Sequence, residues 1–135
     1  MKAPALLVAA VAASGSVAGC GGVDAPKDAS VDEFCAGYVS VFSDVAGESG
    51  AITAEQIKAW GADLENTGTP QDVSEDERAG FEIVVEFAED LDEDASGDDL
   101  QEPKVSADEQ QQVDDFLTYT HEKCADALAQ AVAGG

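Results

Sequence analysis

The sequence predicts an all-α fold, a small bundle of four helices. Two observations favour this class: four helix-start motifs of the capping-box type recur along the chain, and each is followed by apolar residues spaced three and four positions apart. We find no strand-like alternation of useful length and no internal repeat in the sequence. The expected helical domain covers residues 30–133, a single-domain length with one core.

The first two helices begin at the capping boxes formed by Ser30 with Glu33 and by Thr53 with Gln56. In each box the hydroxyl is expected to accept a hydrogen bond from the backbone N–H three residues later. The Glu or Gln side chain at that later position is expected to accept one from the backbone N–H of the first residue. Glycines at 47, 50 and 68 end these helices. Their apolar stripes are Val31, Phe34, Cys35, Tyr38, Val41, Phe42 and Val45 in the first and Ile57, Trp60 and Leu64 in the second.

The third and fourth helices begin at the capping boxes formed by Ser74 with Glu77 and by Ser106 with Glu109. The third stripe is wide, which predicts the most buried element of the bundle. We expect these helices over about residues 75–91 and 107–132. Their stripes are Phe81, Ile83, Val84, Val85, Phe87, Ala88 and Leu91, and then Val113, Phe116, Leu117, Thr120, Cys124, Ala127, Leu128 and Ala131.

The chain is strongly acidic. Its 135 residues include 29 Asp and Glu but only six Lys and Arg, for a formal net charge of −23 at pH 7. Such a field repels nucleic-acid phosphates and anionic lipid headgroups, so a nucleic-acid partner is excluded. Cations or basic proteins remain as charged partners, and solubility in a salty habitat is the alternative explanation of the charge.

The first 19 residues form an apolar leader. Lys2 precedes an uncharged apolar run that is too short for a permanent membrane span. Its end, Val17-Ala18-Gly19-Cys20, resembles the lipobox of bacterial lipoproteins. That resemblance implies a signal peptide at 1–19, cleavage before Cys20 and attachment of diacylglycerol, with acyl chains such as palmitate, to its sulfur. The alternative is an ordinary secretory signal that leaves Cys20 as a free thiol.

The resemblance also implies a location. A lipidated Cys20 would hold the protein on the extracytoplasmic face of a cell membrane, with residues 20–29 as a flexible tether rich in small residues. Stretches such as Thr69-Pro70-Gln71-Asp72-Val73-Ser74 and Phe116-Leu117-Thr118-Tyr119 also resemble small uncharacterised helical lipoproteins of high-GC Gram-positive bacteria. This second likeness brings no activity with it.

Lipidation of Cys20 would leave Cys35 and Cys124 as an even pair in an oxidising compartment. Both cysteines lie on apolar stripes, so we expect a disulfide that joins the first and last helices. Two buried free thiols are the alternative.

The most suggestive segment for chemistry is the acidic run at 92–98. Asp92, Asp94 and Ser96, followed by Gly97, match the first half of an EF-hand calcium loop, and Asp98 adds a further oxygen ligand. The second half does not match, because Pro103 occupies the position of the bidentate glutamate. The run therefore predicts either a calcium site or a solvated acidic loop.

Motifs for catalysis are missing from the sequence. His121 is the single histidine, and no Gly-x-Ser-x-Gly, phosphate-binding loop or Cys-x-x-Cys occurs in the predicted mature chain. A hydrolase using His121 or paired acids is the least favoured hypothesis. Trp60 and Tyr38 could line a cleft, but their stripe positions favour the core. We therefore expect a non-enzymatic, membrane-tethered module that contacts another envelope or secreted component, and alternatively a calcium- or small-ligand-binding lipoprotein.

Overall fold

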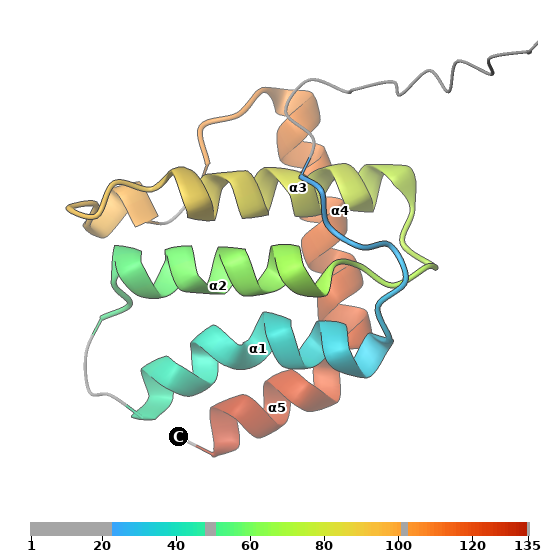
Figure 1. The fold of residues 1–135 in the computed structure, drawn as a ribbon, viewed down its shortest axis with the longest axis horizontal. Helices are drawn as coiled ribbons and strands as arrows, with labels where there is room; N and C mark the ends of the chain where they lie inside the picture. Colours follow the sequence, from blue (N-terminus) through green and yellow to red (C-terminus); the bar gives the residue numbers. More distant parts are fainter. Residues whose placement is uncertain (1–22, 48–50, 101–102, 135) are drawn as a thin grey trace, which may run out of the picture.

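A computed structural model describes residues 23–47, 51–100 and 103–134 of the chain. Every regular element within these ranges is helical, which confirms the predicted all-α class. All four capping boxes form as expected, including Ser30 with Glu33. The elements are α1 (Val31–Gly47), α2 (Ala54–Thr67), α3 (Glu75–Asp90), the short 3₁₀ helix η1 (Gly97–Leu100), α4 (Ala107–Lys123) and α5 (Ala125–Ala133) (Figure 1).

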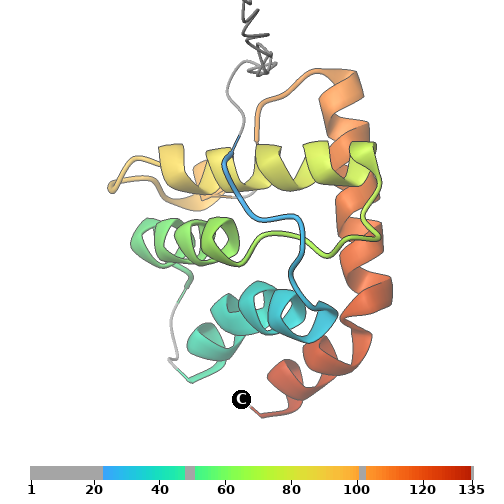
Figure 2. The same cartoon turned by 45° about the vertical axis from the view of Figure 1, so that its right-hand side comes forward.

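The helices do not all run side by side. α1, α2 and α3 lie next to one another, and α4 crosses them steeply while packing chiefly on α3 (Figures 1 and 2). Gly80 permits this close crossing, because a side chain there would collide with the backbone carbonyl of Gln112 and with Phe116. The described helices therefore form a layer with a crossing helix.

The predicted fourth helix is two helices. We expected one helix over about 107–132, but α4 ends at Lys123, and α5 begins at Ala125 and packs along α1. Cys124 at the junction has φ −106° and ψ 15°, outside helical geometry. The bend returns Leu128 and its neighbours to the core of the domain. Tertiary packing overrides an uninterrupted helical sequence here, and the described residues form five α-helices instead of four.

The core is centred on three fully buried phenylalanines from three helices. Phe116 of α4 meets Phe34 of α1 and Phe81 of α3 edge to face, with ring centroids 6.2 Å and 5.7 Å apart. Beside them Cys35 is bonded to Cys124, with their Cα atoms 5.3 Å apart. The predicted disulfide is thus confirmed, and it ties α1 to the α4–α5 junction.

Part of the predicted tether is docked on the domain. Ala25 is buried, and the backbone N–H groups of Ala29 and Thr69 donate to the carbonyls of Thr69 and Pro26 at 3.2 and 2.9 Å. Gly68, with φ +76°, makes this approach possible, because a side chain there would collide with the Pro26 carbonyl. The segment from Ala25 onward is held against the α2–α3 connection instead of extending freely.

Arg78 of α3 holds this segment. Its guanidinium donates to the carbonyls of Ala25 and Pro26 at 2.8 and 3.0 Å and to the hydroxyl of Thr69 at 2.8 Å, and it pairs with Glu82 at 2.9 Å. The side chain is buried and its charge is fully partnered, as a buried arginine requires.

No described helix is long and apolar enough to cross a membrane. Cys20 and the predicted signal peptide lie outside the described residues.

Candidate binding site

The acidic run follows the end of α3. Leu91 caps that helix with extended backbone and a buried side chain, and the chain then turns at Asp92, whose carbonyl accepts a hydrogen bond from the N–H of Ala95 at 2.9 Å. η1 follows from Gly97. The loop therefore projects from one end of the helical layer, next to the connection into α4 (Figure 1).

The predicted calcium ligands remain exposed. Asp92, Asp94, Ser96 and Asp98 all face solvent. Across the described ranges, no three His, Cys, Asp or Glu side chains come together closely enough to hold a metal ion. The loop geometry thus gives no support to a calcium site, which stays a prediction from sequence.

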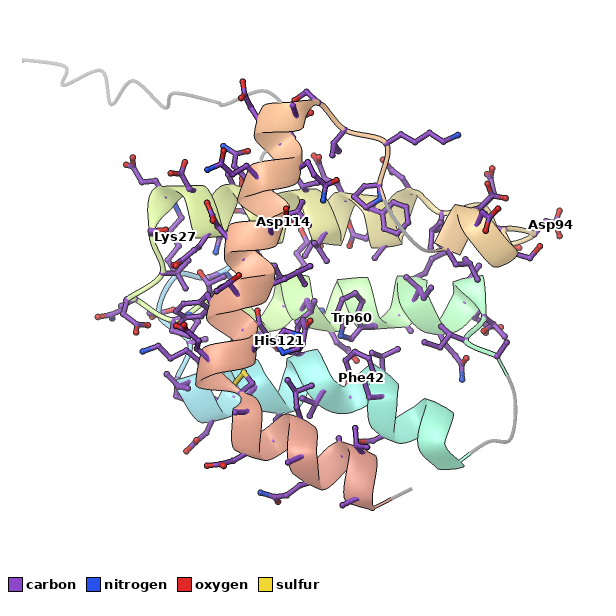
Figure 3. The ribbon with its side chains drawn as sticks, turned by 180° about the vertical axis from the view of Figure 1, so that it is seen from behind. Lys27, Phe42, Trp60, Asp94, Asp114 and His121 are labelled. Carbon is purple, nitrogen blue, oxygen red and sulfur yellow. A yellow bond between two sulfur atoms is a disulfide. The ribbon has the colours of Figure 1, made fainter. Side chains whose placement is uncertain are left out.

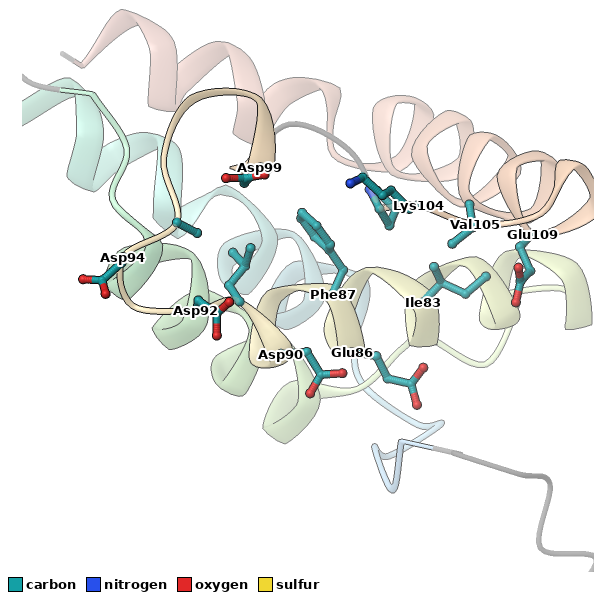
Figure 4. Close-up of a pocket in the computed structure, with 13 residues that line it drawn as sticks. Ile83, Glu86, Phe87, Asp90, Asp92, Asp94, Asp99, Lys104, Val105 and Glu109 are labelled. Carbon is teal, nitrogen blue, oxygen red and sulfur yellow. The ribbon is translucent and has the colours of Figure 1, made fainter.

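Next to this loop is a pocket of about 560 Å³. It lies between the second half of α3, the acidic loop and the segment that leads into α4, and Phe87 and Ile83 project into it from α3 (Figure 4). The apolar lining consists of Ile83, Phe87, Leu91, Ala95, Pro103 and Val105. The charged lining consists of Glu86, Asp90, Asp92, Asp94, Asp99, Glu109 and Lys104. An apolar floor with a strongly acidic rim is the result.

The end of α3 already binds one cation of the chain. Lys58 of α2 places its ammonium 3.0 Å from the carbonyl oxygen of Leu91. A helix C-terminus carries partial negative charge, and the last turn of α3 contains no basic residue. Asp90 and Asp92 add full negative charges at the same end. The field at the pocket therefore favours cationic groups and opposes anions.

A pair of carboxyl groups lies farther along the α2–α3 contact. Glu89 shares a hydrogen bond with Glu65, and burial followed by this contact raises the pKa of Glu89 above its usual value of 4.5. The charges of Asp90 and Glu86 act in the same direction. Like charges gathered here lower the stability of the free protein at neutral pH, in addition to the acidic rim.

Another polar cluster joins the α2–α3 connection to α4. The Tyr119 hydroxyl donates to Asp72 at 2.8 Å, and the Lys123 ammonium lies 2.7 Å from the other oxygen of the same carboxylate. These hydrogen bonds, that of Lys123 first, hold the pKa of Asp72 below its usual range. Burial and the Asp72 contact raise the pKa of Tyr119. Each group has a structural partner, so the cluster holds α4 against the α2–α3 connection.

His121 lies elsewhere, on the exposed face of α4. It borders a shallow depression with Asp114, Leu117, Thr118 and Glu122, and its side chain is exposed. Figure 3 shows it on the side of the molecule that also carries Phe42 and Trp60. Tyr38 is buried and Trp60 donates its indole N–H to the Tyr38 carbonyl at 3.0 Å, so both aromatic side chains belong to the core as favoured.

The fold and the pocket define a class: a small, acidic, disulfide-linked helical domain with an open, acid-rimmed apolar pocket. Comparisons with known proteins do not narrow that class, since no family model, no curated protein and no solved structure matches the chain.

Sequence reasoning found the acidic part of this pocket but not its floor. The wide stripe of the third helix predicts Ile83 and Phe87 as part of its buried face, and the sequence marks neither Lys104 nor Val105 as a functional residue. The available signal was the position of Ile83 and Phe87 at the margin of the main stripe, one to two turns before a dense acidic run. Their partner segment, 103–105, could not be recognised because its position depends on where α4 packs.

Proposed function

We propose that the protein is a membrane-tethered, extracytoplasmic lipoprotein that acts as a non-enzymatic binding module. Its partner is another envelope or secreted component, received at the acid-rimmed pocket between α3 and the start of α4. The single observation that carries the proposal is the combination of an open apolar floor with six carboxylates and one lysine in the lining.

Charge placement supports a binding role. Asp90 and Asp92 stand at a helix C-terminus, where acidic side chains are unfavourable, and they line the pocket together with four further acids. Such an arrangement lowers the stability of the isolated domain, and a basic partner would relieve it. A sequence selected only for solubility would gain more from spreading the same charges.

The docked N-terminal segment supports a location close to the membrane. From a lipid on Cys20, five residues reach the buried Ala25, a span of at most about 18 Å. A longer free tether would let the domain reach partners far from the membrane, whereas this short tether restricts the domain to partners at or near the membrane surface.

Site-specific photo-cross-linking in intact cells tests this function. A photoreactive side chain at Asp94, on the pocket rim, should give a reproducible protein adduct. The matched control is Asp126, an exposed acid on α5, which packs along α1. The proposal fails if Asp94 gives no reproducible adduct, or if both positions capture the same proteins.

A second candidate function is binding of a small organic cation or of calcium at the same loop. The position of Asp92, Asp94 and Asp99 in the pocket lining favours the organic cation, whereas calcium binding rests on the sequence match of the loop. Thermal melting of the full chain with calcium, magnesium, chelator or a set of organic amines tests this alternative. A ligand present at 100 times its dissociation constant should add about 2.7 kcal/mol to the free energy of unfolding.

A further inference from the structure

We infer that the pocket receives a protein segment in which an apolar side chain is flanked by lysine or arginine residues. This inference rests on the proposed binding function and specifies the chemistry of the partner. It follows from how the apolar and acidic parts of the pocket are arranged around each other.

The floor provides a place for one apolar side chain. Ile83 and Phe87 lie one turn apart on α3 and are half-buried, and Val105 of the segment before α4 contributes a second wall. The volume of about 560 Å³ lies within the range of pockets that hold small organic groups. Val105 is half-buried and belongs to neither of the two core clusters, so its exposed apolar surface is open to the pocket.

Acidic side chains lie on both sides of that floor. Figure 4 shows Phe87 between Asp99 of η1 on one side and Glu86 and Asp90 of α3 on the other. Asp92 and Asp94 close the outer end. A segment that places an apolar side chain on Phe87 would therefore meet carboxylates both before and after it, which favours basic residues at the flanking positions.

The end of α3 strengthens this preference. The Leu91 carbonyl accepts a hydrogen bond from the ammonium of Lys58 of α2, as expected where a helix C-terminus attracts cations. Lys104 is the single basic residue in the lining. It leaves a local excess of negative charge for the partner to neutralise.

Other occupants fit less well. A bare metal ion would use neither Phe87 nor Val105, and the described residues supply no cluster of three metal-binding side chains. A phosphate-bearing partner, whether lipid or nucleic acid, would meet carboxylates instead of bases. A protein segment uses the apolar floor and the acidic rim together.

Binding of matched fluorescent peptides to the full-length chain tests the inference. The three cores are lysine–leucine–lysine, lysine–serine–lysine and glutamate–leucine–glutamate, measured by anisotropy over a range of salt concentrations. We expect saturable binding of the first, about tenfold weaker binding of the second because the leucine contact is lost, and no binding of the third. Affinity of the first should fall as salt rises.

Variants locate the binding. Asp94→Asn with Asp99→Asn should weaken the lysine–leucine–lysine peptide roughly tenfold, since two exposed ion pairs are lost. Val105→Ser should weaken it severalfold without affecting the lysine–serine–lysine peptide. The matched controls are Asp114→Asn with Asp126→Asn, which remove the same charge from α4 and α5, and Phe42→Ser, which removes an exposed aromatic side chain from α1. Melting curves check that each variant is folded.

Three results would overturn the inference: equal affinity for the two lysine peptides, equal effects of pocket and control variants, or binding of small organic amines without binding of peptide. A protein adduct at Asp94 in cells combined with no peptide binding would refute this partner chemistry while leaving the proposed function standing. The absence of an adduct in cells, with specific peptide binding in solution, would instead count against the proposed function.

Discussion

Arg78 of α3 donates a hydrogen bond to the backbone carbonyl of Pro26, a residue 52 positions earlier in the chain, at 3.0 Å. The same guanidinium reaches Ala25 and Thr69 and lies over the ring of Phe81, 4.9 Å from its centroid. One buried cation therefore organises the N-terminal segment, the α2–α3 connection and α3. It also fixes where any anchor upstream joins the domain.

Removal of this cation should destabilise the protein. Arg78→Met leaves the buried Ala25 carbonyl without the guanidinium that donates to it and removes one of the two donors to the Pro26 carbonyl, which keeps the Thr69 N–H. We expect a loss of about 2–3 kcal/mol in the free energy of unfolding, measured by denaturant titration. Trypsin should also cleave faster after Lys27, because the docked segment is released. The control Lys27→Met removes an exposed charge and should change stability by less than about 0.5 kcal/mol. Equal stability of the two variants would show that the segment is not held by Arg78.

The disulfide should contribute strongly to stability. Cys35 and Cys124 are separated by 89 positions, and the chain-entropy model assigns a loop of this size about 4–5 kcal/mol. Replacement of both cysteines by alanine should therefore lower the free energy of unfolding by about 2–5 kcal/mol, since native strain and residual structure reduce the ideal value. The measurement is denaturant unfolding of the double variant beside the oxidised chain. A wild-type chain that takes up alkylating reagent at both positions without reductant would contradict the bond itself.

The acid pair on α2 and α3 should respond to pH. The pKa of Glu89 is raised in the folded state, so the folded protein binds a proton more readily than the unfolded chain at pH values just above 4.5. The unfavourable contribution of the charged pair is thus fully present above the raised pKa and is relieved as the pH falls through it. Glu89→Gln should raise the melting temperature at pH 7 and flatten its dependence on pH in this window.

The matched control for this experiment is Glu93→Gln, which removes the same charge from the exposed loop. It separates the effect of the Glu65 contact from the general benefit of making the net charge of −23 less negative. An equal rise in melting temperature for both variants would mean that the overall charge, and not this pair, limits stability.

Lipid attachment at Cys20 should place the protein in the membrane fraction. Cells fed a clickable fatty acid should label the wild-type protein, and Cys20→Ala should abolish the label and release the protein from membranes. The control Cys35→Ala removes a cysteine without touching the lipobox and should keep the label. A Cys20→Ala variant that stays membrane-bound would rule out this anchor.

The sequence alone was sufficient for the helix starts. The capping boxes depend on side chains three residues apart, so Ser74 with Glu77 and Ser106 with Glu109 could be recognised without tertiary information, and both form. The inward position of Cys35 and Cys124 followed from helical periodicity, and the disulfide between them confirms it.

Only the tertiary structure decided how these helices are arranged and where the pocket lies. Nothing in residues 107–132 interrupts a helix locally, and the bend at Cys124 arises because α5 must turn back to bury its apolar face against α1. In the same way, Arg78 meets Pro26 only once the N-terminal segment has docked on α3, and Phe87 and Val105 line one pocket only after α3 and α4 have packed. Periodicity within one helix specifies which face is buried, but the choice of partner depends on the shapes of both surfaces, as at Gly80, where the lack of a side chain lets α4 cross α3.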